Sequence, residues 1–426
     1  MPEWTKLERG ALASLREELQ AKYDGFKSRG LRLDMSRGKP SPAQLDLAND
    51  LLICLGTDDF TAADGTDCRN YGGLDGIPEA KQLFADYLEV KPAEIVIGGN
   101  SSLAMMHDTI ARAMSHGAPG GAAPWGRLPA VKFLCPSPGY DRHFTVCQHL
   151  GLEMLTVPMC EDGPDMDAVE RLAAWDEAVK GIWCVPKYSN PSGITYADEV
   201  VRRLAAMRTR AEDFRIFWDN AYAVHDLYER TDPLLNILDA CKEAGHPDRV
   251  FIFGSTAKIS FAGAGIAMAA GSETNMAWLK RHLFAQTIGP DKLNQLRHVR
   301  CFGDLAGIRR HMEKHRAILR PKFEMVRERL AAGLGDKGIA DWTRPNGGYF
   351  ISFNTLPGCA GRVVALAAAA GVKLTEAGAT FPYGLDPLDR NIRIAPSYPP
   401  LDELQQALEL LIICVQLASA ERLLAG

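Results

Sequence analysis

Short, largely apolar runs alternate with stretches of helical periodicity over the first 300 residues of this chain. Each run ends in small or polar residues; the runs are Glu94–Ile97, Val131–Cys135, Gly181–Val185, Arg215–Trp218 and Val250–Phe253. Several are separated by helical patterns, at 78–89, 100–115, 165–180 and 197–212. Strands that alternate with helices need right-handed crossovers and form a mostly parallel sheet. The pattern therefore predicts a large α/β domain.

The alternation of apolar runs with helical patterns ends near residue 300. The pattern there predicts a long helix over 307–330, a strand over 347–353, a helix over 361–371, a strand over 391–395 and a terminal helix over 401–422. A helix over 6–22 and an extended segment over 31–42 precede the first strand. We expect an N-terminal arm (1–45) that joins a smaller α+β domain (301–426), with the large domain between them (46–300).

Composition and charge exclude several classes of protein. The 426 residues include 48 Lys and Arg against 53 Asp and Glu, a net charge of −5, which argues against binding nucleic acid through its phosphates. The longest apolar stretch, 363–372, is too short to span a membrane. The N-terminus, Met1–Trp4, lacks the pattern of a secretory signal. These features predict a cytoplasmic enzyme without membrane or nucleic-acid partners.

The ten cysteines are scattered and include no C-x-x-C pair. In a chain of this length such cysteines are typical of buried thiols in a reducing compartment. We therefore expect neither a disulfide framework nor a structural zinc site.

The polar clusters that could carry chemistry follow the predicted strands. Ligands of open parallel sheets bind outside the carboxyl ends of the strands, where the loops converge. Five residues in such loops are therefore expected to be neighbours in space: Asn190, Asp219, Tyr222, Ser255 and Lys258.

The residue types in these loops suit one cofactor. A lysine among small residues after a strand, Lys258, can form a Schiff base. Asp219 leaves a very apolar run and needs a cationic partner, such as a pyridinium nitrogen. Asn190 and Tyr222 can hydrogen-bond a phenolate oxygen, and the helix start at 99–102 offers N–H groups and hydroxyls to a phosphate. Together these groups match pyridoxal 5′-phosphate (PLP), an electron sink for amino-acid carbanions.

The sequence resembles the type I PLP-dependent aminotransferases, nearest to the aspartate aminotransferase and MocR-like subgroup. The resemblance runs from Arg37-Gly38 to Arg393, and it is carried by the order and separation of several motifs. These motifs are Tyr71-Gly72-Gly73-Leu74-Asp75-Gly76, Asn190-Pro191-Ser192-Gly193, Asp219-x-Ala221-Tyr222, Ser255-x-x-Lys258, Asn346-Gly347-Gly348-Tyr349-Phe350 and Asn391-Ile392-Arg393-Ile394.

The resemblance implies a role for each matching residue. Lys258 would bind PLP covalently and move a proton, and Asp219 would keep the ring nitrogen protonated. Asn190 and Tyr222 would hydrogen-bond the ring oxygen. The remaining implied contacts are Tyr140 stacked on the ring, Asn100, Ser101, Ser102 and Ser255 on the phosphate, and Arg393, Gly38 and Asn190 at the substrate. Tyr71 would reach the phosphate from a second subunit, which implies a homodimer with shared active sites.

Two points concern charge. Relatives often carry a phosphate-binding arginine seven or eight residues after the lysine, where this chain has Gly265 and Ile266. The nearest branch of the family favours aspartate or glutamate with a 2-oxo acid, so a second cation should meet the distal carboxylate. Arg37 is our candidate, because it adjoins Gly38 and a guanidinium suits a carboxylate.

Other interpretations of the same residues stay open at this stage. Asn190-Pro191 can be a simple turn, Ser101 and Ser102 helix caps, Tyr140 a packing residue and Arg37 a solvated arginine. Ser255-x-x-Lys258 also matches a serine acylase signature, but the chain has no Lys-Thr-Gly. A MocR-type regulator would need an N-terminal DNA-binding domain, for which we see no room. The main rival is a PLP-dependent lyase or decarboxylase of the same fold.

Overall fold

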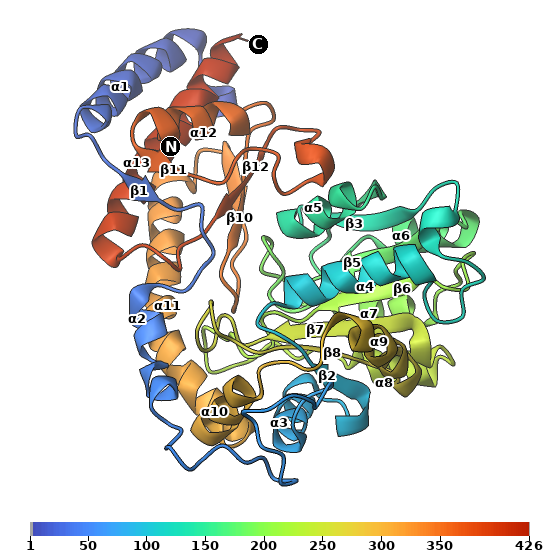
Figure 1. The fold of residues 1–426 in the computed structure, drawn as a ribbon. Coiled ribbons are helices and arrows are strands. Elements are labelled where there is room, and N and C mark those ends of the chain that lie inside the picture. The colour runs from blue at the N-terminus through green and yellow to red at the C-terminus, as the bar shows by residue number, and fades with distance from the viewer. Residues whose placement is uncertain (1–2, 426) are drawn as a thin grey trace.

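A seven-stranded sheet forms the centre of the larger part of the computed structural model, which describes residues 3–425 (Figure 1). The strands are β2 (Ile95–Ile97), β3 (Lys132–Ser137), β4 (Glu153–Pro158), β5 (Val179–Cys184), β6 (Arg215–Asp219), β7 (Val250–Ser255) and β8 (Ala267–Gly271). Their spatial order is β2-β8-β7-β6-β5-β3-β4. The pairs from β7 to β4 are parallel, and β8 is antiparallel to both neighbours. The prediction of a mostly parallel α/β sheet is confirmed.

Helices cover both faces of this sheet, so the central strands β5, β6 and β7 are buried at every position. One face packs on α3 (Pro78–Leu88), α6 (Met166–Trp175), α7 (Asp198–Ala206) and α8 (Ile237–Glu243). The other packs on α4 (Ser102–His116), α5 (Asp141–His149) and α9 (Glu273–Gln286). Burial on two faces explains why these strands read as continuous apolar runs rather than as alternating ones.

The sequence pattern missed β4 and β8 and made two helices too long. β4 lies at the edge of the sheet and alternates between buried and open positions. β8 reads Ala-Met-Ala-Ala-Gly, without the branched or aromatic residues that favour strands. The helix expected over 165–180 ends at Trp175, because the chain enters β5 at Val179, and the one expected over 197–212 ends at Ala206.

The rest of the chain packs around a 30-residue helix, α11 (Leu305–Leu334), that runs alongside both parts of the molecule (Figure 1). It carries a three-stranded antiparallel sheet of β9 (Ala340–Trp342), β10 (Ile351–Thr355) and β12 (Asn391–Ile394), with α12 (Ala360–Ala369) and α13 (Leu401–Ala425) beside it. The N-terminal segment belongs to this part: α1 (Arg9–Lys27) packs along α13, and β1 (Leu33–Asp34) pairs with β11 (Val372–Lys373).

The strand expected over 347–353 begins later, at Ile351, because its glycines are used for close packing. A Cβ on Gly347 would lie 2.2 Å from Tyr188 Cε2, and one on Gly348 would lie 2.8 Å from Tyr188 Cβ. Gly347 forms an isolated bridge with Asp226 instead of entering the sheet. The exact division of the chain at residues 45 and 300 stays a prediction.

Within residues 3–425, no helix is both long and apolar enough to cross a membrane, and no three His, Cys, Asp or Glu residues are grouped to hold a metal. Met1, Pro2 and Gly426, which the predictions on the N-terminus and the domain ends include, lie outside the described residues. The ten cysteines all lie within them as free thiols, and most are buried.

Candidate active site

The carboxyl ends of β3, β5, β6 and β7 meet at one small cavity. One residue of the N-terminal arm and one of the smaller part of the chain also line it. Seven of the predicted site residues line it: Gly38, Ser102, Tyr140, Asn190, Asp219, Tyr222 and Lys258. Leu103, Met106, Val185, Ala221 and Phe350 complete the wall. The cavity therefore gathers residues that lie up to 312 positions apart in the sequence.

Asp219 is the last residue of β6 and is held by a histidine that the sequence analysis missed. His143 Nε2 lies 3.0 Å from Asp219 Oδ2, and both side chains are buried. The His143 ring stacks on Trp183, with ring centres 4.2 Å apart, and Tyr140 packs edge-on against it at 4.9 Å. Asp219 Oδ1 is buried without a hydrogen-bond partner. A buried carboxylate oxygen needs a partner, so this one is available to a ligand in the cavity.

Lys258 lies in the turn that follows β7, with its amine inside the cavity. Its Nζ is 5.1 Å from the centre of the Tyr222 ring, and no hydrogen bond or ion pair of this amine is found within residues 3–425. Burial lowers the pKa of Lys258, while the Asp219 carboxylate opposes part of that shift. Desolvation therefore favours the neutral, nucleophilic form of the amine.

Arg393, on β12, approaches the cavity from the smaller part of the chain. Its Nη1 donates to Asp141 Oδ1 at 2.6 Å and to Asn190 Oδ1 at 3.3 Å. The guanidinium carbon lies 4.9 Å from the centre of the Phe350 ring. Arg393 Nε is buried without a partner, so one side of the guanidinium stays free for a carboxylate.

The arm residues Gly38 and Arg37 are placed very differently. A Cβ on Gly38 would lie 1.9 Å from Phe350 Cζ, so only glycine fits at this point of the cavity wall. Arg37 does not line the cavity. Its Nε pairs with Asp34 Oδ2 at 3.0 Å, and 56% of its side chain is exposed.

The residues expected at a phosphate are divided between two places. Ser102 lines the cavity, and Ser255 is buried at the end of β7. Ser101 caps α4 by accepting a hydrogen bond from Ala104 N, and Asn100 Nδ2 donates to Gly263 O at 3.0 Å. Asn100 and Ser101 line a neighbouring cavity on the outer side of the same helix start.

Gly265, one of the two positions where relatives often have arginine, lies under the lysine turn. A Cβ there would be 3.0 Å from both Ala257 N and Thr256 Oγ1, tighter than nearly all real contacts. The close approach of the two backbone segments therefore leaves little room for a larger side chain.

Tyr71 does not reach the cavity of its own chain, and 82% of its surface is exposed. The loop that carries it is held by a buried lysine, because Lys292 Nζ donates to Asn70 O and Gly72 O, both at 2.7 Å. Tyr71 is thus presented outward on a fixed backbone.

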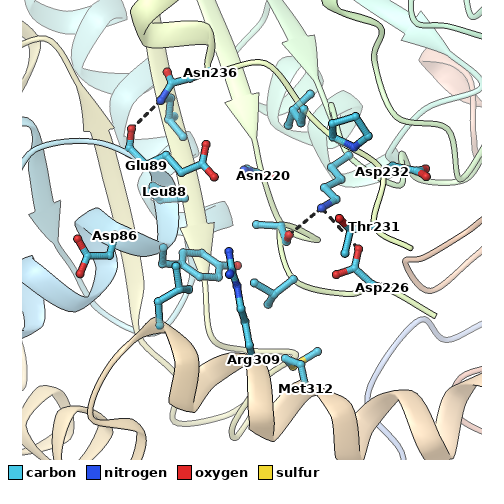
Figure 2. Close-up of a pocket in the computed structure, with 18 of the residues that line it drawn as sticks. Asp86, Leu88, Glu89, Asn220, Asp226, Thr231, Asp232, Asn236, Arg309 and Met312 are labelled. Carbon is cyan, nitrogen blue, oxygen red and sulfur yellow. Dashed lines mark hydrogen bonds and ion pairs between the residues drawn. The ribbon is translucent and has the colours of Figure 1, made fainter. Parts of the chain in front are cut away.

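A second cavity, of about 370 Å³, lies on the opposite side of the sheet end (Figure 2). Successive residues of a strand point to opposite faces, so Asp219 faces the first cavity whereas Asn220 lines the second. Figure 2 shows Arg309 entering it from α11, with Asp226 on the far side. Lys187 Nζ donates to Ala223 O at 3.1 Å and lies 3.5 Å from Asp226 Oδ1. No predicted site residue lines this cavity, so the candidate active site is the cavity that Asp219 and Lys258 line.

Known proteins share this fold and much of this sequence. The aspartate amino-transferase family model matches residues 7–426. An aspartate aminotransferase of Corynebacterium glutamicum is 49% identical over 405 residues, which are 95% of this chain and 94% of that protein. The solved structure of an aspartate transaminase from the same species has a TM-score of 0.97 at 47% identity and covers 99% of each chain.

A more distant structure shows the same fold. An α-aminoadipate aminotransferase of Thermus thermophilus, solved with N-(5′-phosphopyridoxyl)-L-leucine, has a TM-score of 0.74 at 21% identity over 95% of this chain and 97% of that one. The assignment rests on the match to the family model and on the C. glutamicum sequence and structure, which are covered almost from end to end. The chain therefore belongs to the aspartate amino-transferase family and is an aminotransferase.

Proposed function

We propose that this chain uses PLP, bound by Lys258, to transfer the amino group of aspartate or glutamate to a 2-oxo acid. One observation carries the cofactor assignment: Lys258 and Asp219, whose Oδ1 is buried without a hydrogen-bond partner, line one cavity at the ends of β6 and β7. The substrate assignment is supported by the name of the C. glutamicum relative, an aspartate aminotransferase.

The residues of the cavity fit PLP. Asp219 Oδ1 offers a buried acceptor for a protonated ring nitrogen, and Lys258 offers an amine whose pKa is lowered by burial. Asn190 and Tyr222 supply hydrogen-bonding groups on the same wall, and Tyr140 supplies an aromatic face. Bound PLP would give the buried Asp219 Oδ1 the partner that it lacks.

PLP, when bound, supplies the electron sink that stabilises negative charge at the substrate Cα. Lys258, released by the incoming amino acid, would then take the Cα proton and return it on the cofactor side, as a positioned general acid and base. Asp219 would keep the ring nitrogen protonated. His143, fixed by its stacking on Trp183, would hold the Asp219 carboxylate in that orientation.

The substrate side of the cavity is proposed to use Arg393 and the arm. Arg393 would bind the α-carboxylate with the part of its guanidinium that is free of Asp141 and Asn190. Gly38 would let the arm approach the same carboxylate. Arg37 would have to exchange its ion pair with Asp34 for the distal carboxylate of the substrate, which requires movement of its side chain.

Phosphate binding is proposed to rest on Ser102, Ser255 and the amide groups at the start of α4, with Asn100 and Ser101 supporting that helix start. The dipole of α4 favours an anion at this end. The hydroxyls and the helix end would thereby take over part of the task that an arginine performs in many relatives.

We also propose a cytoplasmic homodimer with shared active sites, in which Tyr71 reaches the partner's phosphate. Three exposed apolar side chains, Tyr71, Phe284 and Ile288, support an interface, because Gly289 contacts Gly72 and so brings their two segments together. Sedimentation at micromolar concentration should show a dimer. A fully active monomer would remove Tyr71 from the site.

Absorption spectroscopy tests the whole proposal. The purified protein should be yellow, its visible band should shift on addition of aspartate, and the original band should return with 2-oxoglutarate. An amino acid that shifts the band without return by any 2-oxo acid would contradict amino transfer and favour a lyase or decarboxylase. A colourless protein that takes up no added PLP would contradict the cofactor assignment.

A further inference from the structure

We propose that Gln44 and Tyr349 are positioning residues, which hold the backbone of Lys258 and connect it to the arm that carries Gly38. The inference rests on the proposed role of Lys258. It concerns groups outside the cavity, because neither Gln44 nor Tyr349 lines it. Both are fully buried, so their polar atoms must find partners within the protein.

The lysine turn needs such support because the sheet ends before it. The last ladder position of β7 is Ser255, paired with Ala267, and the turn closes through bonds from Ile259 N and Ser260 N to Thr256 O, each 2.8 Å. The carbonyl oxygens of Lys258 and Ile259 accept hydrogen bonds from side chains instead of pairing in a strand ladder.

Four side chains converge on these two carbonyl groups. Tyr349 Oη lies 3.4 Å and His225 Nε2 lies 3.3 Å from Lys258 O. His311 Nε2 and His315 Nε2 lie 2.8 and 3.0 Å from Ile259 O, and 3.1 Å from each other. A carbonyl oxygen can only accept, so the tyrosine hydroxyl must donate to Lys258 O.

Gln44 organises two of these donors at once. Its Oε1 accepts from Ser41 N at 3.1 Å, which fixes the direction of the amide. Its Nε2 then lies 2.8 Å from Tyr349 Oη and 3.2 Å from His315 Nδ1, so its two hydrogens serve two acceptors. His315 Nδ1 therefore accepts, which leaves the proton on Nε2, the nitrogen that faces Ile259 O.

The hydrogen bonds thus form a directed path from the arm to the lysine. It begins at Ser41, three residues after Gly38, in the capping box of the short helix α2 (Pro42–Asp46). It passes through Gln44, and from there through Tyr349 to Lys258 O and through His315 to Ile259 O. Each bond orients the next, an arrangement in which the members strengthen one another.

Burial keeps the members neutral at ordinary pH. It lowers the pKa of His315 to about 4 and of His225 to about 3, and it raises the pKa of Tyr349 well above its usual value. The donors and acceptors therefore keep their assigned directions across the neutral range. A movement of the arm at Gly38 is transmitted to the turn that sets the position of Lys258 Nζ.

The first test compares Tyr349→Phe with Tyr23→Phe in the full-length protein as purified. Tyr23 is a matched control, since it is also buried and donates to a backbone carbonyl, Leu366 O, but lies far along the chain from the lysine. Hydrogen exchange at the amides of Ile259 and Ser260 is measured by mass spectrometry or NMR. Tyr349→Phe should speed this exchange about 2- to 10-fold, the range of one neutral hydrogen bond, and Tyr23→Phe should leave it unchanged.

Kinetics supply a second measurement. Tyr349→Phe should lower kcat for the amino-acid half-reaction about 2- to 10-fold with little change in KM, because the lysine is displaced whereas the substrate groups are not. Equal exchange rates in the two variants, or a loss that falls only on KM, would overturn the proposal. If the role proposed for Tyr349 is wrong and the proposed function is right, the protein still transfers amino groups. If the proposed function is wrong, the Lys258→Ala variant stays active.

Gln44→Met tests the hydrogen-bonded path from the arm to the lysine, because it preserves the volume of the side chain and removes both N–H donors of the Gln44 amide. It should increase exchange at Ile259 in the same way as Tyr349→Phe. The double variant should be little worse than the more affected single variant, since the two residues act in series. Fully additive effects would show that they act separately and would overturn the connection between the arm and the lysine.

Discussion

The two walls of the catalytic cavity are built in different ways. The wall at the strand ends is buried: Asp219 and Tyr222 are 3% and 2% exposed, and His143 Nε2 lies 3.0 Å from the Asp219 carboxylate. The arm wall consists of a segment without a sheet ladder, where the Arg37 side chain is 56% exposed beside Gly38. The comparison teaches that the proposed chemistry lies on buried strand ends, whereas the arm contributes a closely packed glycine and an exposed arginine.

The largest effect should come from the wall at the strand ends, at Lys258. Lys258→Ala should abolish turnover, because a positioned acid and base contributes about 10²- to 10⁴-fold and the covalent attachment of PLP is lost as well. The amino-acid half-reaction is measured with excess donor. Appreciable turnover by Lys258→Ala would place the catalytic lysine elsewhere. Lys187→Ala serves as the control, because it removes another buried lysine that does not line the catalytic cavity.

Asp219→Ala should come next and should separate chemistry from binding. PLP should still bind through Lys258, whereas the half-reaction should slow by about 10²-fold or more, since a preorganised charge at the reacting group is lost. Stopped-flow absorbance measures the rate, and cofactor content measures binding. His143→Ala, which leaves the Asp219 carboxylate in place, should slow the half-reaction less than Asp219→Ala does. A variant with an unchanged rate and lower stability would show that Asp219 is structural.

Gly38→Ala probes the point where the two walls meet. The added methyl would overlap the Phe350 ring, so the arm must move outward, and a displacement of about 1 Å can cost about 10²-fold in kcat/KM. Phe350→Ala in the same variant should recover part of the loss by making room. Unchanged kinetics in Gly38→Ala would mean that the arm does not contact the substrate.

Arg37→Ala has the smallest expected effect and tests the arm wall directly. The value of kcat/KM for aspartate should fall about 10- to 100-fold, because a charged hydrogen bond contributes about 1.5–3 kcal/mol. Alanine as amino donor should be affected little, and Arg32→Ala on the same arm should behave as the parent protein. Equal losses for aspartate and alanine would assign Arg37 a structural role with Asp34.

The sequence indicated which polar residues lie at or after the strand ends, because these signals are local. A buried parallel strand is a short apolar run; Asp219 ends such a run directly, and Asn190 lies in the loop after another. The family resemblance, now confirmed by the family model, rested on the same loops. Edge strand β4 and the alanine-rich β8 lack that local signal, and both were missed.

His143, Gln44 and Tyr349 show what local patterns cannot reveal. His143 is one of ten histidines, and nothing near it in the sequence points to Asp219, 76 residues away. Gln44 reads as part of a capping box, yet its amide also serves Tyr349 and His315, 305 and 271 residues further on. Only the packing of α2 and α11 against the lysine turn brings these groups together.

The sequence alone thus determined the α/β class, the lysine and carboxylate at the strand ends and the family, because apolar runs and loop motifs are short-range properties. The tertiary structure decided which oxygen of Asp219 stays free, that Gly38 must be a glycine beside Phe350, that Arg37 rests on Asp34, and how the lysine turn is anchored. These are contacts between segments distant in sequence. Their geometry depends on how the sheet, the arm and α11 pack together, and no periodicity within one segment encodes it.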